Sequence, residues 1–196
     1  MSRRLLDRTD LLPLERYHLE RQSFRRRVLE HKTTRKVFIG QNVHLTFEDA
    51  LTIQYQIQEM LRVERIFETQ AIQDELDAYN PLIPDGDNWK ATMLIEYEDV
   101  EDRRHALEQL VGIEHRVWVK VGDEPAIFAI ADEDLERSRD NKTSAVHFLR
   151  FQLTPRVVSA AKAGDNLGLG VDHPMYRYSI AFIPDATRLS LISDLS

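Results

Sequence analysis

A glutamate lies among apolar residues in the segment Ile53–Glu68. On a helix turning about 100° per residue, the apolar side chains of this segment form one arc, with Glu64 at its centre. That arc contains Ile53, Ile57, Met60, Leu61, Val63 and Phe67. A carboxylate is rarely buried alone, because losing its hydration costs several kcal/mol. We therefore expect Glu64 to be buried and to contact a cation, a metal ion or hydrogen-bond donors.

The chain contains seven histidines, and the periodicity of their surroundings separates them. Side chains alternate between the two faces of a strand. This alternation places His115, His147 and His173 on the same faces as neighbouring valine, leucine and phenylalanine side chains. The same reasoning places His44 and His105 opposite their apolar neighbours. We expect the first three histidines to be buried and the last two to be exposed.

Three imidazoles and a carboxylate are suitable ligands for iron, manganese or zinc, with room for an open coordination position. The sequence therefore predicts a metal site formed by Glu64, His115, His147 and His173. Two alternatives stay open. Each inward histidine could bond to a carboxylate or carbonyl at the edge of the core, and Glu64 could form a buried ion pair with an arginine. The candidate arginines are Arg116 and Arg150.

Composition excludes several classes of function. The 196 residues carry a net charge of −7 and no cysteine, which disfavours nucleic-acid binding and excludes disulfides, thiolate metal sites and cysteine nucleophiles. The chain lacks the glycine-rich and serine motifs of nucleotide-binding proteins and serine hydrolases, so no nucleotide cofactor is indicated. The run Arg25–Arg27 is typical of the solvated face of an amphipathic helix.

The same features predict the compartment. No apolar run approaches the roughly 20 residues of a membrane span, so no membrane association is expected. Asp7 and Asp10 interrupt the basic N-terminus before any apolar stretch, so no secretory signal is expected either. We expect a cytoplasmic protein.

The elements that must position these residues alternate without strict βαβ order, which predicts an α+β fold over residues 1–196 as a single globular domain. A long helix is expected to begin at Asp10, with Pro13 in its first turn. We expect this helix and the Ile53–Glu68 helix to pack on a mostly antiparallel or mixed sheet. The turn-rich stretch NPLIPDGDNW, residues 80–89, is the best candidate for a functional loop.

Five segments together resemble an uncharacterised bacterial family, catalogued as domain of unknown function 3501. They are IQEMLRVERIFE, ELDAYNPLIPDGDNWKATMLIEY, GIEHRVWV, DNKTSAVHFLRF and GVDHPMY. The resemblance implies a small cytoplasmic protein, often encoded beside rubrerythrin-like and flavin/iron–sulfur oxidoreductase proteins. It implies no catalytic residues. The four expected metal ligands all lie within these segments.

These observations lead us to expect a soluble accessory protein of a redox or oxidative-stress pathway, with a buried His/Glu site for a divalent metal. An oxygen- or peroxide-linked reaction at that metal is the first expectation for any catalysis, and it rests on the family context. The alternative is a non-catalytic subunit or adaptor that docks on a flavin/iron–sulfur oxidoreductase. The sequence leaves the substrate, the identity of the metal and the oligomeric state open.

Overall fold

The computed structural model describes residues 5–139 and 141–196. The basic start of the N-terminus, residues 1–4, lies outside this part of the chain. The helices are α1 (Leu14–Lys32), α2 (Ala50–Glu64), α3 (Thr69–Tyr79), α4 (Val100–Gln109), α5 (Pro155–Ala163) and α6 (Asp185–Ile192). Short 3-10 turns are η1 (Arg8–Asp10), η2 (Asn80–Leu82) and η3 (Ile113–Arg116).

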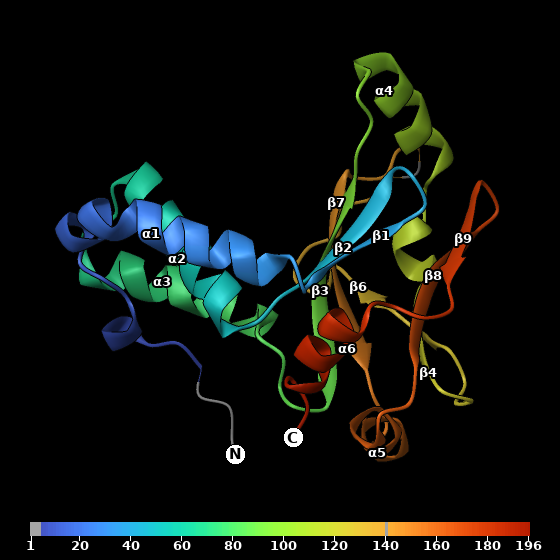
Figure 1. Ribbon diagram of the computed structural model, residues 1–196. Helices are drawn as coiled ribbons and strands as arrows, with labels where there is room; N and C mark the ends of the chain where they lie inside the picture. The colour runs from blue at the N-terminus through green and yellow to red at the C-terminus, as the bar shows by residue number, and fades with distance from the viewer. Residues whose placement is uncertain (1–4, 140) are drawn as a thin grey trace.

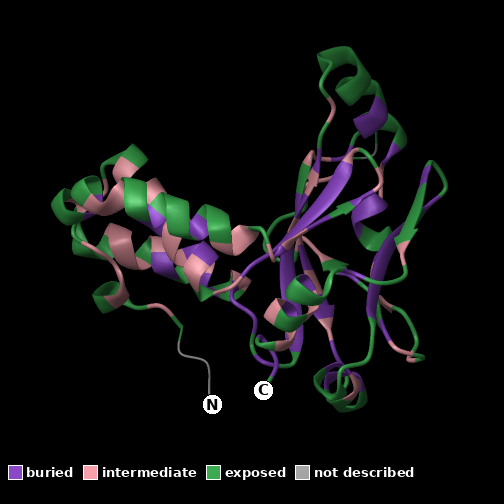
Figure 2. Ribbon diagram, viewed as in Figure 1, coloured by how far each residue is buried: buried purple, intermediate pink, exposed green. Residues whose placement is uncertain are grey.

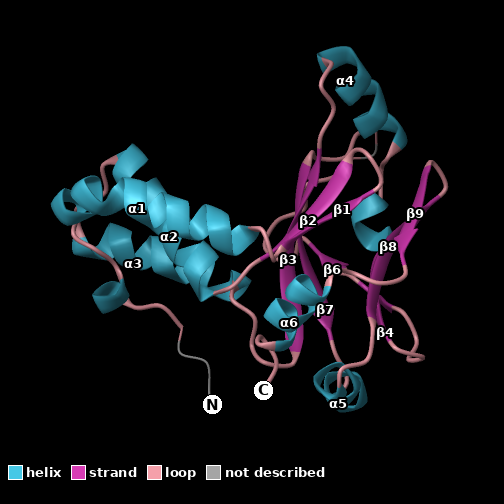
Figure 3. Ribbon diagram, viewed as in Figure 1, coloured by secondary structure: helices cyan, strands magenta, loops and turns pink. Residues whose placement is uncertain are grey.

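The strands form two antiparallel sheets that enclose the largest core (Figures 1 and 3). One sheet has the order β1-β2-β3-β7-β6 and the other β5-β4-β8-β9. The strands are β1 (Lys36–Ile39), β2 (Val43–Phe47), β3 (Asn88–Ile95), β4 (Val117–Val121), β5 (Ile127–Phe128), β6 (Ile130–Ala131), β7 (Val146–Gln152), β8 (Leu167–His173) and β9 (Tyr176–Ile180). This arrangement confirms the α+β prediction.

Helices α1, α2 and α3 lie together beside the sheets (Figure 1). Their apolar contacts form two smaller clusters, separate from the core between the sheets, and their outer faces are exposed (Figure 2). Glu59 joins α1 to α2, because its carboxylate accepts hydrogen bonds from Tyr17 and Arg21, each at 2.7 Å. Helix α1 begins at Leu14 rather than Asp10, because Asp10 belongs to the separate turn η1.

Arg35 connects the helices α1, α2 and α3, which we call the helical layer, to the sheets. Its guanidinium is almost fully buried and donates to the carbonyls of Phe47 and Glu48, at 2.9 and 3.0 Å. The same group pairs with Asp194, two residues after the end of α6. One buried side chain therefore connects the end of α1 to the start of α2 and to the C-terminal segment. None of the helices in the described ranges has the length and apolar character needed to cross a membrane.

Candidate functional site

Glu64 is exposed, so the prediction of a buried glutamate was wrong. Helix α2 buries the stripe Ile53, Ile57 and Leu61, and it ends at Glu64, where Arg65 adopts the left-handed conformation. The predicted arc continued past this end, and its members Val63 and Phe67 are 57% and 63% exposed. The alternative expectation, an ion pair between Glu64 and Arg150, is not met, because the Arg150 side chain pairs with Glu133 at 2.7 Å.

His115 is also exposed, so its predicted burial was wrong. It lies in the 3-10 turn η3, and the strand β4 begins only at Val117. Strand alternation therefore does not apply to His115. His44 is buried, contrary to expectation, because both faces of β2 are covered and its ring lies against Phe38. Burial and the nearby Lys36 lower the pKa of His44.

The burial of His147 and His173 and the exposure of His105 are confirmed. His173 is satisfied locally, with Nε2 3.2 Å from the carbonyl of Val111 and Nδ1 accepting from the backbone N–H of Met175. The predicted ligands therefore do not share one site. Across residues 5–139 and 141–196, no group of three or more His, Cys, Asp or Glu side chains is placed to hold a metal ion.

His147 instead belongs to a buried hydrogen-bond network. Its Nδ1 lies 2.6 Å from a carboxylate oxygen of Asp132, and its Nε2 lies 2.9 Å from the Thr143 hydroxyl and 3.0 Å from the Ser144 carbonyl. Glu114 closes the network, because it accepts from Thr143 at 3.3 Å and from Ser138 at 2.6 Å. We call these residues the His147 network.

The partners of His147 determine what it can do. The Asp132 carboxylate and the Ser144 carbonyl only accept hydrogen bonds, whereas the Thr143 hydroxyl can donate or accept. Glu114 lies farther away, 3.9 Å from Nε2. These contacts hold the ring in one orientation in the core. The network therefore resembles a catalytic triad in composition, and it connects β7 to the segment that precedes it.

A hollow of about 1010 Å³ lies where the helices α2 and α3 meet the outer face of β3 and β7. Its lining comes from both layers and from the segment after β6: Met60, Glu75, Asp77, Ala78, Tyr79, Pro81, Leu82, Asp85, Lys90, Glu133, Asp134, Arg137, Phe148, Leu149 and Arg150. We call it the interlayer pocket. Pro81, Leu82 and Asp85 belong to the loop 80–89, the region singled out from its turn residues.

The sheet side of the pocket carries three cations, each paired with a carboxylate. Lys90 and Arg150 are direct neighbours across β3 and β7. Lys90 Nζ contacts Asp85 at 2.9 Å, and Arg150 forms two bonds with Glu133, at 2.7 and 2.8 Å. The Arg150 hydrogen bonds lower the pKa of Glu133. Burial alone would raise the pKa of Asp85, but its bonds with Lys90 and Asn88 lower it overall.

Arg137 provides the third cation and links the pocket to the His147 network. Its guanidinium lies 4.5 Å from the centre of the Phe148 ring and bonds twice to Asp134, at 2.6 and 2.7 Å. It also lies 3.3 Å from Asp132, the carboxylate that binds His147. Through the contact between Arg137 and Asp132, the His147 network therefore holds the segment 133–137 in place. This segment forms one wall of the pocket.

The helix side of the pocket is different, because it is acidic. Glu75 and Asp77 project from α3, with the half-buried ring of Tyr79 beside them. Asp77 accepts a hydrogen bond from Gln73 at 2.8 Å. Burial raises the pKa of Glu75, and the negative charges of Asp74 and Glu64 raise it further. Although Glu64 is exposed, its negative charge therefore acts on Glu75 at this wall.

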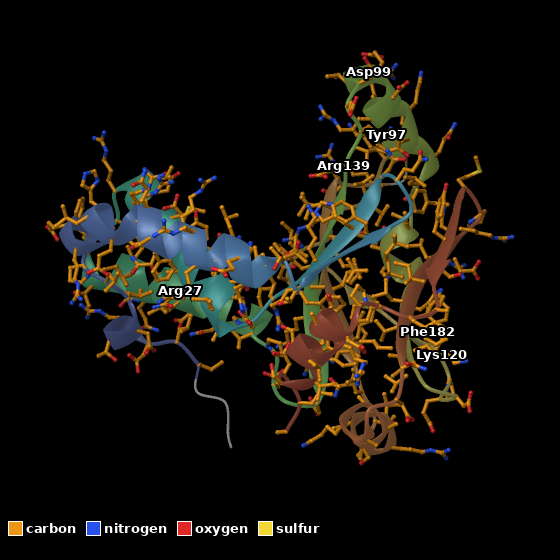
Figure 4. All side chains as sticks on the ribbon, in the orientation of Figure 1. Arg27, Tyr97, Asp99, Lys120, Arg139 and Phe182 are labelled. Atoms are coloured by element: carbon orange, nitrogen blue, oxygen red, sulfur yellow. The ribbon has the colours of Figure 1, made fainter. Side chains whose placement is uncertain are left out.

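A second hollow of about 740 Å³ lies on the outer face of the four-stranded sheet. Lys120 and Phe182, labelled in Figure 4, line it together with the backbone of Gly168. Lys120 and Phe182 are both exposed, so a ligand there would stay largely in contact with water. The interlayer pocket, with half-buried charged groups on two facing walls, is the stronger candidate.

Sequence reasoning missed most residues of this pocket. Lys90 and Arg150 meet only because β3 pairs with β7 in one particular register. The sequence offered Arg150 only as a possible partner of Glu64, and nothing local connects it with Lys90. Glu75 lies on a helix whose neighbouring acids look like an ordinary solvated face.

Comparisons with known proteins agree with this fold. A crystal structure of a "novel protein of unknown function" from Burkholderia pseudomallei K96243 has 52% sequence identity and a TM-score of 0.94. The match covers 98% of this chain and 100% of that one. A search of curated proteins found no match. The family model described as "Protein of unknown function (DUF3501)" matches residues 5–195, so the chain belongs to that family.

Proposed function

We propose that this protein is a soluble, cytoplasmic accessory protein of a redox pathway that binds a small organic molecule in the interlayer pocket. The observation that carries the proposal is the pocket itself. Ligand sites are concave, mostly apolar and marked by a few fixed polar groups, with volumes of roughly 300–1,000 Å³. The interlayer pocket, at about 1010 Å³, combines apolar side chains such as Leu82 and Phe148 with charged groups held in fixed ion pairs.

The pocket is preorganised on the sheet side. Phe148 and Arg150 are carried by a central strand of the five-stranded sheet, and the segment 133–137 is fastened to that strand through Asp132 and His147. A wall held in this way needs little ordering when a ligand arrives, which favours binding. The α3 side belongs to a different apolar cluster, so it can adjust to the ligand without disturbing the main core.

The redox pathway in this proposal rests on the family resemblance. The proposal contains no metal ion, because Glu64 and His115 are exposed and do not join His147 or His173 in a common site. Any chemistry would then take place on a partner protein, and this protein would present or sense the small molecule.

The pocket can be tested with a neutral fluorescent probe, N-phenyl-1-naphthylamine, whose emission increases in apolar sites. We expect saturable binding to the wild-type protein. Ala78→Trp should abolish it, because Ala78 lines the pocket on α3 and an indole there would occupy the hollow. Ala186→Trp places the same side chain at an exposed position on α6 and should bind like the wild type. Equal binding by both variants would contradict the proposal.

A second candidate function, an adaptor, is favoured by the outer face of α1. Arg25 and Arg26 are exposed and form no ion pair with any other residue that the structure describes, and Leu19 and Leu29 beside them are 82% and 50% exposed. Such a basic and apolar face suits an acidic protein partner. We expect the tagged protein to co-purify with a rubrerythrin-like or flavin/iron–sulfur oxidoreductase protein, and Arg25→Glu with Arg26→Glu to remove that partner. Retention of the partner by the double variant would contradict the adaptor role of this face.

A further inference from the structure

The charges of the interlayer pocket do not balance. Its sheet side contains three cations and three carboxylates, and each cation bonds to one of those carboxylates. The helix side adds Glu75 and Asp77. The lining therefore carries two negative charges that none of its own cations neutralises, and both lie on α3.

Glu75 is the better placed of these two acids. The residue is half-buried, and its side chain has no hydrogen bond or ion pair within the described ranges. Asp77 is exposed and already accepts a bond from Gln73. The charged groups that act on Glu75 are Asp74 and Glu64, and both raise its pKa together with burial. A half-buried carboxylate surrounded by like charge is stabilised by a cation that enters the pocket.

We propose that the ligand of the interlayer pocket is an organic cation, with an ammonium or amidinium group bound by Glu75 and an apolar body packed between the two walls. This inference rests on the proposed function and names the class of molecule that the pocket takes. The body would lie between Tyr79 on the helix side and Phe148 on the sheet side, both of which line the hollow. The face of Tyr79 also attracts a cation directly, which adds to the preference, whereas Phe148 already contacts the Arg137 guanidinium.

An anionic ligand fits this pocket less well. To reach Arg137 or Arg150 it would have to displace Asp134 or Glu133, each of which is bound by two hydrogen bonds of 2.6–2.8 Å. The displaced carboxylate would then lie beside the anion. A cation at Glu75 displaces no existing partner of that carboxylate. Both walls of the pocket therefore favour a positively charged ligand over a negatively charged one.

Three indoles with one body and different charges test the proposal: tryptamine, the neutral tryptophol and indole-3-propionate. Binding to the full chain is measured by displacement of N-phenyl-1-naphthylamine and by calorimetry. We expect the wild type to prefer tryptamine over tryptophol by about tenfold, since a half-buried ion pair contributes on the order of this ratio. We expect indole-3-propionate to bind most weakly.

Glu75→Gln removes the charge and keeps the shape of the side chain. It should bind tryptamine and tryptophol equally while it retains affinity for the neutral probe, which shows that the pocket is intact. Glu98→Gln removes an equal charge from an exposed position outside the pocket and should keep the wild-type preference. A preference for tryptamine that survives in Glu75→Gln would overturn the assignment of Glu75.

The two proposals fail in different ways. Tighter binding of indole-3-propionate than of tryptamine would overturn the cation inference while the pocket stays a binding site. Loss of all binding, including that of the neutral probe to the wild type, would refute the pocket as a binding site and the cation inference with it.

Discussion

At the scale of single residues, His147 shows how a buried polar ring is accommodated. Its side chain is fully buried, and both ring nitrogens have hydrogen-bond partners, Asp132 on one side and Thr143 and the backbone of Ser144 on the other. A buried polar group that loses its partner keeps the cost of its lost hydration. The His147 network should therefore be sensitive to the loss of any one member.

Replacing His147 with alanine should lower the free energy of unfolding by about 3–5 kcal/mol, because it leaves a cavity in the core and removes hydrogen bonds from Asp132, Thr143 and Ser144. His105→Ala is the matched control. That side chain is exposed on α4, and its loss should change stability by less than about 0.5 kcal/mol. Urea denaturation of both variants measures the difference, and equal midpoints would show that the contacts of His147 do not stabilise the fold.

Glu59 makes stability depend on pH. Its hydrogen bonds with Arg21, Tyr17 and Arg62 lower the pKa of this carboxyl from 4.5 to about 2 despite partial burial. A carboxyl whose pKa is lower in the folded state stabilises the fold above its unfolded pKa and loses that effect as pH falls.

We therefore expect the Glu59 contribution to be complete above about pH 5 and to be lost between pH 4.5 and about 2. The loss should reach up to about 2 kcal/mol, after allowance for partial exposure. Thermal denaturation of the wild type and Glu59→Gln across this range measures it. The variant should be less stable near neutrality, and the gap should narrow in acid. A constant gap would exclude this linkage.

The residue predictions made from sequence needed both a regular element that extends through the residue and one covered face. His44 lies inside β2, and its predicted exposure was wrong because both faces of that strand are buried. His147 is flanked on both sides by strand β7, so alternation identified its buried face. Glu64 and His115 lie at or beyond the ends of their elements, where the helical or strand period no longer determines direction. The sequence also indicated a carboxylate at the inward histidines as an alternative to metal, and Asp132 is that partner of His147.

At the scale of elements, residue types explain individual boundaries. Thr154 caps α5, Pro155 occupies its first helical position, and Gly164 ends it in the left-handed conformation. The pocket was not predictable in this way. Its two walls come from α3 and from β3–β7, and only the packing of these elements brings Glu75 near the Lys90–Arg150 pair.

The segment between β6 and β7 should open more often when the contacts of the His147 side chain are removed. Asp132 anchors one end, with its backbone N–H donating to the carbonyl of Phe148 at 2.8 Å, and Thr143 anchors the other by donating to Leu107 at 3.0 Å. We expect trypsin to cleave His147→Ala after Arg137 or Arg139 at least several-fold faster than the wild type, because local opening exposes these sites. Mass spectrometry identifies the cut, and His105→Ala should resist like the wild type. Unchanged cleavage at these arginines would mean that the segment is held independently of His147.

At the scale of the whole molecule, the structure has one large core between the sheets and smaller clusters among α1, α2 and α3. The sequence predicts a single domain over residues 1–196. This stays a prediction, and it depends on how strongly the sheets and the helices α1, α2 and α3 are held together. Arg35 is the central contact. It reaches the carbonyls of Phe47 and Glu48, the carboxylate of Asp194 and, at 3.4 Å, Asp49 at the cap of α2.

If Arg35 joins the two parts, Arg35→Met should both destabilise the protein and uncouple its unfolding. Asp194 would lose its buried counter-ion, which costs about 3–5 kcal/mol. Both tryptophans, Trp89 and Trp118, lie on strands, so their emission reports the sheets, whereas far-ultraviolet circular dichroism also reports α1, α2 and α3. We expect the two urea transitions to coincide in the wild type and to separate in Arg35→Met, because loss of the shared contact lets the helical layer unfold first. Arg25→Met, an exposed substitution on α1, should keep the transitions together. Coincident transitions in Arg35→Met would show that the layers are coupled through other contacts, such as those lining the interlayer pocket.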